Sequence, residues 1–222
     1  GGSLPPYAEL NLGSHVGDDL RTVGANRAAV ASAVGLAPER LVFMEQVHDR
    51  NVVLVDGPRE TPPVADALVT RTPGLALVVL VADCVPVLLA DAAAGVVAAA
   101  HAGRKGVELG VVGAALQVMQ DCGARPERIR VRLGPSIGGC CYEVPEQMQR
   151  EVAAAAPGAG AARTRAGTPS LDLRAGLAAQ LAELGIADVG LTGGCTQDDT
   201  DFFSYRRDHV TGRFAGLVWL ES

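Results

Sequence analysis

Three residues combine metal-ligand chemistry with a place at the end of an apolar run: His48 in EQVHD, Cys84 in ADC and His101 in VAAAHAG. Each precedes a turn that contains Gly, Pro or Asp, which is where a sheet presents side chains to a cleft. Two imidazoles and one thiolate, with a fourth position open, form the ligand set of a catalytic zinc site. Their spacing matches no local zinc signature, so histidines held by core hydrogen bonds and an ordinary buried thiol are the alternative interpretation.

Asp83 stands beside Cys84 within an otherwise apolar run, where an unpaired carboxylate would be costly to bury. A hydrogen bond to a ligating imidazole would satisfy it, and so would general-base catalysis at the metal. The alternative is a carboxylate that caps a nearby turn. We therefore predict that Asp83 lies in the same cleft, with its role left open among these three.

Two further segments carry side chains suited to a phosphate or a flat ring. In AHAGRKG, residues 100–106, Arg104 and Lys105 stand beside backbone N–H groups at a predicted helix start. This arrangement predicts a phosphate cradle, and a tight turn with two solvated cations is the alternative. In FFSYRRD, residues 202–208, Phe203 and Arg206 suit stacking on a flat ring with an anion nearby, or else form a hydrophobic corner with surface arginines.

The remaining histidines and one glycine-rich loop receive structural interpretations. The loop GPSIGGCCYEV, residues 134–144, has neither a dinucleotide-binding nor a nucleophile-elbow spacing. We expect it to line the site, with Cys140 and Cys141 packed rather than reactive. His15 and His209 are predicted to be polar turn residues.

The elements that must position these residues mix strands with helices. Apolar and β-branched runs between residues 41 and 101, separated by Gly, Pro and Asp, predict a sheet buried largely on both faces. Asp18 and Asp19 before it and Gly35 at its end predict a helix over 20–34. Further helices are expected over 106–121, 145–155 and 171–184, further strands over 129–134, 187–191 and 213–220, and a mobile Ala/Gly-rich stretch up to 167. No repeat or long linker divides the chain, so the expected class is mixed α and β in one domain.

Composition excludes several classes of protein. The 222 residues carry a formal net charge of −6 and a pI near 5.2, which argues against general attraction to nucleic acid or anionic membranes. Five cysteines without a C-x-x-C pair indicate neither a disulfide framework nor a zinc ribbon, and they favour a reducing cytoplasm. The most apolar run, residues 74–90, is interrupted by Asp83 and Pro86 and is too short to span a membrane. No leader opens the sequence, and its first residue, Gly1, suggests a trimmed N-terminus.

Seven motifs, in their order along the chain, resemble one known family. They are NLGSHVGDD, QVH, DALVT, ADCVPVLLAD, AHAG, GPSIGGCCYEV and FFSYRRD. The family is the laccase-domain or "polyphenol oxidase" family of zinc-dependent purine nucleoside phosphorylases, and the resemblance covers nearly all of residues 1–222. It implies zinc bound by His48, Cys84 and His101, and a single compact α/β (α+β) domain with layered mixed β-sheets flanked by helices, similar to cysteine-hydrolase toxins.

The resemblance also implies an activity. It is the cleavage of adenosine and inosine, with methylthioadenosine as a further candidate, by phosphate to base and ribose 1-phosphate, with adenosine deamination at the same metal. Two departures affect substrate placement. The family has Trp-Arg where this chain has Arg104 and Lys105. The family also begins with an extra strand and T-T-R before G-G-V-S, whereas this sequence starts at Gly1, so that strand is expected to lie outside it.

Three other functions remain as alternatives. A copper-dependent polyphenol oxidase is disfavoured, because a multicopper cluster needs paired histidines and this chain has four isolated ones. A cysteine-dependent hydrolase or deamidase would use Cys84 as nucleophile with His48 or His101 as base. A scaffold with a structural zinc would need a fourth protein ligand.

Overall fold

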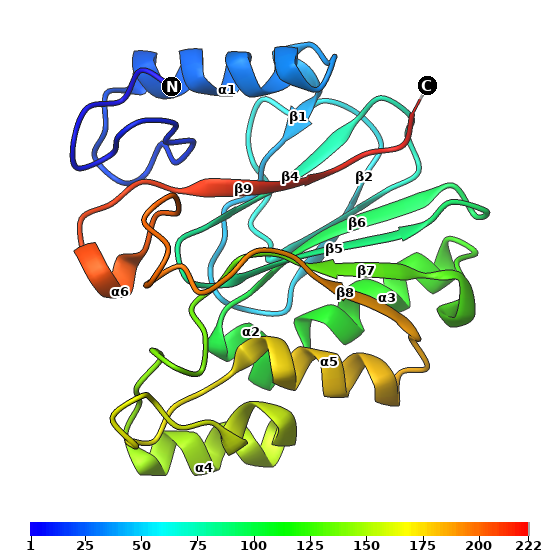
Figure 1. Ribbon diagram of the computed structural model, residues 1–222. Helices are drawn as coiled ribbons and strands as arrows, with labels where there is room; N and C mark the ends of the chain where they lie inside the picture. Colours follow the sequence, from blue (N-terminus) through cyan, green and yellow to red (C-terminus); the bar gives the residue numbers. More distant parts are fainter. Residues whose placement is uncertain (222) are drawn as a thin grey trace.

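The computed structural model describes residues 1–221, which form two stacked β-sheets with helices on both sides (Figure 1). The larger sheet has six strands in the order β2-β3-β6-β5-β7-β8, and the smaller has three in the order β1-β4-β9. The strands are β1 Leu41–Val42, β2 Val52–Val55, β3 Ala67–Thr70, β4 Ala76–Val81, β5 Val85–Asp91, β6 Val96–Ala102, β7 Arg130–Leu133, β8 Asp188–Leu191 and β9 Phe214–Val218. Both sheets mix parallel and antiparallel neighbours. The predicted mixed α/β class is confirmed.

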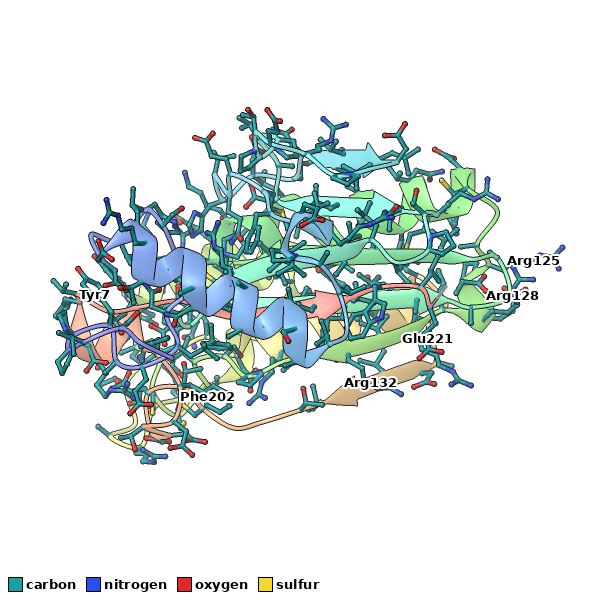
Figure 2. The ribbon with its side chains drawn as sticks, turned by 90° about the horizontal axis from the view of Figure 1, so that it is seen from above. Tyr7, Arg125, Arg128, Arg132, Phe202 and Glu221 are labelled. Carbon is teal, nitrogen blue, oxygen red and sulfur yellow. The ribbon has the colours of Figure 1, made fainter. Side chains whose placement is uncertain are left out.

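Most of the helices lie on the two outer faces of this stack, and the last one lies at one end of it (Figure 1). The helices are α1 Leu20–Ala33, α2 Arg104–Leu109, α3 Val111–Asp121, α4 Glu146–Ala155, α5 Leu173–Glu183 and α6 Tyr205–Asp208, with short 3-10 turns at η1 Pro38–Arg40, η2 Pro126–Arg128 and η3 Pro157–Ala161. Helix α1 crosses over the smaller sheet when the molecule is seen from above (Figure 2). Helices α2, α3 and α5 lie beneath the larger sheet (Figure 1). No helix within residues 1–221 is long and apolar enough to cross a membrane.

Strand alternation divides the interior into three apolar layers. On β4, Leu77 and Val79 face the larger sheet, whereas Val78 and Leu80 face α1. On β6, even-numbered residues pack towards the helices below and odd-numbered residues pack between the sheets. Both strands are therefore buried on both faces, which is why they appear in the sequence as continuous apolar runs.

Two predicted boundaries are correct for the expected reason, and one predicted helix is wrong. Helix α1 begins after Asp19, whose carboxylate accepts a hydrogen bond from Thr22 N–H, and the chain leaves it through Gly35 at φ 73°. The single helix expected over 106–121 is two helices, α2 and α3. Gly110 separates them with a φ of 75°, a left-handed conformation that glycine adopts without strain.

Three other expectations also differ from the structure. The runs between 41 and 101 form two sheets rather than one, since β1 and β4 pair with each other and with β9. Strand β9 is half-buried rather than buried. The Ala/Gly-rich stretch expected to be mobile includes η3, which packs closely: a Cβ on Gly158 would lie 2.7 Å from the Ala175 carbonyl oxygen, and one on Gly160 2.3 Å from Ala153 Cβ. Small residues there permit η3 to pack against both α4 and α5.

Candidate functional site

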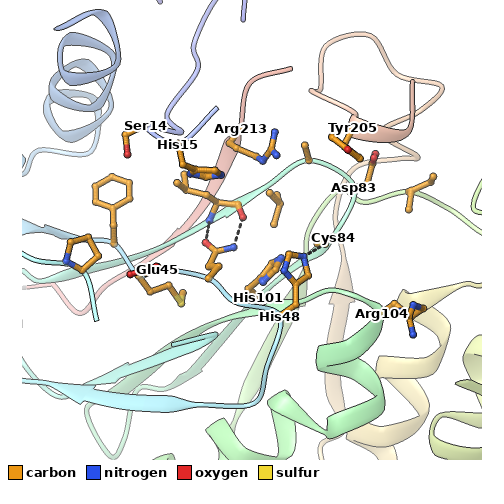
Figure 3. A pocket seen from close by; sticks show the side chains of 18 of the residues that line it. Ser14, His15, Glu45, His48, Asp83, Cys84, His101, Arg104, Tyr205 and Arg213 are labelled. Atoms are coloured by element: carbon orange, nitrogen blue, oxygen red, sulfur yellow. Dashed lines mark hydrogen bonds between the residues drawn. The ribbon is translucent and has the colours of Figure 1, made fainter. Parts of the chain in front are cut away.

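His48, Cys84 and His101 come together at one end of the two sheets. His48 lies in the irregular segment after β1, Cys84 in the turn between β4 and β5, and His101 near the end of β6. Their ligand atoms all lie within 4.8 Å of one another, and Cys84 Sγ is 3.9 Å from His48 Nε2 (Figure 3). His101 is buried, Cys84 is half-buried and His48 is exposed, so the cluster opens to solvent on the His48 side.

The segment carrying His48 is not the strand that the run LVFMEQV predicts, because β1 ends at Val42. In this segment the side chain of Gln46, rather than the backbone, pairs with β4. Its Nε2 donates to the Leu80 carbonyl at 2.7 Å, and its Oε1 accepts from Leu80 N–H at 2.9 Å (Figure 3). The backbone is thereby free to turn, and His48 adopts a φ of 61°. This strained conformation presents the imidazole to the cluster.

A buried carboxylate that the sequence analysis missed, Asp66, holds both histidines. Its Oδ1 accepts a hydrogen bond from His101 Nδ1 at 2.8 Å and from His48 N–H at 3.0 Å. Its Oδ2 accepts from the N–H groups of Val47 and Asp49. The bond to Nδ1 fixes the ring of His101 and leaves its Nε2 available as a ligand.

Gly103, the glycine of AHAG, is required by the close approach of two of these side chains. A Cβ at this position would lie 2.9 Å from His48 Cδ2 and 3.0 Å from Cys84 Sγ. Gly103 also precedes α2, whose backbone starts directly beneath the cluster. Any larger residue would push apart the imidazole and the thiol.

The cluster has the electrostatics of a thiolate beside an imidazolium. Burial alone would raise the pKa of Cys84, but the charge of His101 and hydrogen bonds from His101 and His48 lower it to about 6. Burial would lower the pKa of His101, but the Cys84 thiolate and the hydrogen bond to Asp66 raise it to about 9. The thiol is thus ready to ionise at neutral pH, as a metal ligand or a nucleophile must.

Asp83 lies in the same wall with its carboxylate already hydrogen-bonded. Oδ1 accepts from Thr196 Oγ1 and Oδ2 from Arg206 N–H, both at 2.6 Å. It caps the start of α6, and the carboxylate that contacts an imidazole is Asp66 instead. The φ of 88° at Asp83 turns the chain between β4 and β5 and so places Cys84.

The cluster forms part of the wall of a cavity of about 860 Å³. Another part of that wall is cationic: Arg27, Arg213 and His15 lie there, with His15 and Arg213 above the cluster in Figure 3. Neither guanidinium has a carboxylate partner within residues 1–221; Arg27 donates to the Leu12 carbonyl and Arg213 to backbone carbonyls. Burial and the charges of Arg213 and Arg27 lower the pKa of His15. This part of the cavity therefore offers positive charge to an anion.

The other residues singled out in the sequence are placed in different ways. Arg104 lines the cavity but forms an ion pair with Glu108 at 2.8 Å. Lys105 is exposed and does not line the cavity. Arg206 lines it, 5.0 Å above the ring of Tyr142. Phe203 does not line it.

The placement of Phe203 has a plain structural cause. Phe203 packs on the backbone at Gly212, where a Cβ would lie 2.6 Å from its ring. His15 lies in a turn, as expected, and also lines the cavity, whereas His209 stacks edge-on against Tyr205. One usable signal for Asp66 is that it directly precedes the buried strand β3 in DALVT. No local signal marks Arg27 or Arg213, since they come from opposite ends of the chain.

The family described as multi-copper polyphenol oxidoreductase laccase matches residues 1–221. The chain belongs to this family. Among its relatives, the purine nucleoside phosphorylase ORF3 of Streptomyces griseus is 54% identical over 224 residues, which cover 100% of this chain and 91% of that protein. The purine nucleoside phosphorylase YfiH of Escherichia coli K12 is 40% identical over 99% of this chain and 90% of its own. The family resemblance drawn from the motifs is confirmed.

Solved structures of the laccase family share the fold. The crystal structure of the Bacillus licheniformis hypothetical protein YfiH superposes with a TM-score of 0.92 at 32% identity, covering 100% of this chain and 89% of that one. The structure of YlmD from Geobacillus stearothermophilus gives 0.91 at 32% identity, covering 100% of this chain and 88% of that one. The two-sheet arrangement is therefore that of the family.

The residues of the cluster fit a metal ion on their own chemistry. One thiolate and two imidazoles suit zinc, the bond from Asp66 leaves His101 Nε2 free, and Gly103 leaves room for the donors to approach. Within residues 1–221 the cluster has three donors, one short of a closed structural set, and it borders the cavity. Such a site leaves a position for substrate.

Proposed function

We propose that this chain is a zinc-dependent purine nucleoside phosphorylase that cleaves adenosine and inosine with phosphate and deaminates adenosine as a side activity. The observation that carries the proposal is one cavity in which a His-Cys-His cluster and unpaired guanidinium groups share the wall. Its size falls in the range of small-molecule sites and accommodates a nucleoside together with phosphate. The names of the relatives support the same reaction class.

Phosphate is assigned to the cationic part of the wall. Arg27 and Arg213 are half-buried, and burial lowers the pKa of each guanidinium, which an anion between them would reverse. Arg27 also lies over the ring of Phe43, 3.9 Å from its centroid, so the guanidinium is held in place before phosphate arrives. Arg104 remains a secondary candidate because Glu108 already neutralises it, and exposed Lys105 is a weaker one.

The base is assigned to the wall formed by Tyr142 and Arg206. In phosphorolysis a phosphate oxygen bonds to C1′ of the ribose while the bond from C1′ to the purine nitrogen breaks, and the purine leaves with that electron pair. Burial raises the pKa of Tyr142, so its hydroxyl stays protonated and can donate a hydrogen bond to the departing base. The Arg206 guanidinium above the ring of Tyr142 fixes that ring.

His48, Cys84 and His101 would hold the zinc ion. When bound there, zinc supplies a Lewis acid at the cavity wall, for phosphorolysis or for deamination at the purine ring. Asp66 holds the imidazole of His101 and the backbone of His48 in place for this purpose. Copper stays disfavoured, because only two of the four histidines belong to the cluster and an oxygen-reducing copper cluster needs more.

The test is a ratio of two activities. Arg213→Ala should lower hypoxanthine release from inosine at limiting phosphate by roughly ten- to a hundredfold, the effect of one lost charge-assisted contact. Ammonia release from adenosine needs no phosphate and should fall far less. Arg21→Ala, an exposed arginine of α1, is the matched control and should change neither activity. Equal losses of both activities would contradict the assignment of phosphate to this wall.

A cysteine-dependent hydrolase is the second candidate, favoured by the ionised Cys84 beside His101. The Cys84 thiolate cannot be a zinc ligand and a nucleophile at the same time, because a sulfur bound to zinc is not free to attack. Alkylation of Cys84 by iodoacetamide separates them. If zinc blocks alkylation and raises activity, the phosphorylase proposal is supported; if zinc blocks both, the hydrolase is.

A further inference from the structure

A second group of ligand atoms lies outside the cavity just described. Cys140, Cys141, Cys195 and Asp198 place three sulfurs and a carboxylate within 4.8 Å of one another, and none of them lines the cavity. The two adjacent thiols come from the loop before α4, and the other two residues from the loop before α6. The packing role expected for Cys140 and Cys141 does not account for a carboxylate among thiols.

The distances between these ligand atoms suit a metal ion with tetrahedral coordination. With bonds of about 2.3 Å to sulfur and about 2.0 Å to oxygen, zinc separates two sulfurs by about 3.8 Å and a sulfur from an oxygen by about 3.5 Å. Asp198 Oδ1 is 3.5 Å from Cys141 Sγ, and Oδ2 is 3.7 Å from Cys140 Sγ. The Sγ atoms of Cys140 and Cys141 are 3.2 Å apart, so a small rotation of either side chain completes the arrangement.

The groups around the cluster donate hydrogen bonds to its sulfur and oxygen atoms, as groups around thiolate ligands do. The N–H of Gly138 donates to Cys195 Sγ at 3.2 Å. The Arg165 guanidinium donates to both oxygens of Asp198 and lies 3.6 Å from Cys141 Sγ. Each carboxylate oxygen has two lone pairs and can accept from Arg165 while it binds a metal. Arg165 and a divalent cation together offset most of the charge of three thiolates and a carboxylate.

The two loops that carry the cluster, before α4 and before α6, each have a buried side-chain oxygen that lacks a hydrogen-bond partner within residues 1–221. These oxygens are Ser136 Oγ and Gln197 Oε1, one on each segment. A single bridge between Ser136 and Cys195 connects the segments along the backbone. An ion bound by all four side chains would therefore add a further link between them.

We propose that Cys140, Cys141, Cys195 and Asp198 bind a second zinc ion, which fastens the loop before α6 to the loop before α4. Four protein ligands make a closed site, which is structural rather than catalytic. The fastened loop matters for the cavity, because Thr196 follows Cys195 directly and donates to Asp83, the neighbour of Cys84. Asp198 is exposed, which gives the ion a path of entry.

The experiment measures zinc in reduced, dialysed protein by elemental analysis. Cys195→Ser should hold about one zinc ion per chain fewer than the wild type, and Asp198→Asn should release zinc to a chelator at least tenfold more readily. Cys122→Ser, a half-buried cysteine outside both clusters, is the matched control and should keep the wild-type content. The test compares the zinc content of each variant with that of the wild type, so its result does not depend on how much zinc the His48-Cys84-His101 cluster holds.

A second measurement distinguishes the loss of a metal ligand from the misfolding of a variant. Protein loaded with Co²⁺ should show a thiolate-to-cobalt absorption band, and Asp198→Asn, whose exposed side chain can change without disturbing the core, should alter it while leaving the circular dichroism unchanged. Equal zinc content in the wild type and Cys195→Ser would overturn the proposal. An intact mass showing loss of two hydrogens without zinc would also overturn it, since the thiols would then form a disulfide.

Discussion

Replacing Asp66 with asparagine separates an organised ligand site from a chance meeting of side chains. Asp66 is fully buried, and its two oxygens accept four hydrogen bonds: from His101 Nδ1 and the N–H of His48 at Oδ1, and from the N–H groups of Val47 and Asp49 at Oδ2. Asparagine keeps the shape but replaces one acceptor with an NH₂ donor. In either orientation that donor faces two of the four N–H groups.

The magnitude follows from counting the groups left unpaired. A buried donor without an acceptor costs about 1–3 kcal/mol, and the N–H groups of Val47, His48 and Asp49 are only partly buried, so Asp66→Asn should lower the free energy of unfolding by about 1–3 kcal/mol in total. A domain is stable by about 5–15 kcal/mol, and the variant should therefore remain folded at low temperature. Loss of the support for His101 should weaken zinc binding by about 10- to 100-fold.

The assay pairs urea unfolding with zinc affinity, measured by competition with a chromophoric chelator. Asp188→Asn is the control, because Asp188 is half-exposed and pairs only with Arg130 and Arg132 at the surface. It should change stability by no more than about 1 kcal/mol and leave zinc affinity unaltered. An Asp66→Asn protein that binds zinc as tightly as the wild type and unfolds no more easily than Asp188→Asn would contradict the role given to Asp66.

Three further outcomes are expected. Gly103→Ala should lose zinc by elemental analysis while circular dichroism stays native, because the new Cβ would lie 2.9 Å from His48 Cδ2 and 3.0 Å from Cys84 Sγ; full zinc content would contradict this. In zinc-free protein, alkylation of Cys84 by iodoacetamide should decline as the pH falls through about 6 rather than through the ordinary pKa of 9.0, and a midpoint near 9 would count against the thiolate. Burial would raise the pKa of Asp91, but its hydrogen bonds, including those from Arg128, hold it below 3.8. The stability that Asp91 contributes is thus complete above that pH and is lost as the pH falls below it, so Asp91→Asn should flatten acid unfolding followed by circular dichroism, and an unchanged acid transition would refute this.

Local chemistry explains how much of the fold could be predicted. Asp19 and Gly35 mark the limits of α1 because capping is a matter of a few adjacent residues. Gly110 could not be recognised as a break, since an isolated glycine in a helical pattern is also tolerated within one helix. The division into two sheets depends on β9 returning from the far end of the chain to pair with β4, which no local pattern records.

The candidate site divides in the same way. His48, Cys84 and His101 could be selected because each follows an apolar run, and the runs end at one side of the stacked sheets. The choice between Asp83 and Asp66 as the carboxylate at the imidazole could not be made, because it depends on β3 lying beside β6, with Ala67 opposite Ala100. The register brings Asp66 next to His101 and leaves Asp83 in a turn.

The most direct test of the central claim is the product formed from inosine by chelated and zinc-reconstituted protein, with and without phosphate. We predict hypoxanthine and ribose 1-phosphate in stoichiometric amounts, identified by phosphorus NMR, only when zinc and phosphate are both present. His101→Ala should form neither product under the same conditions. Release of hypoxanthine with free ribose in the absence of phosphate, or full activity of the chelated protein, would contradict the account.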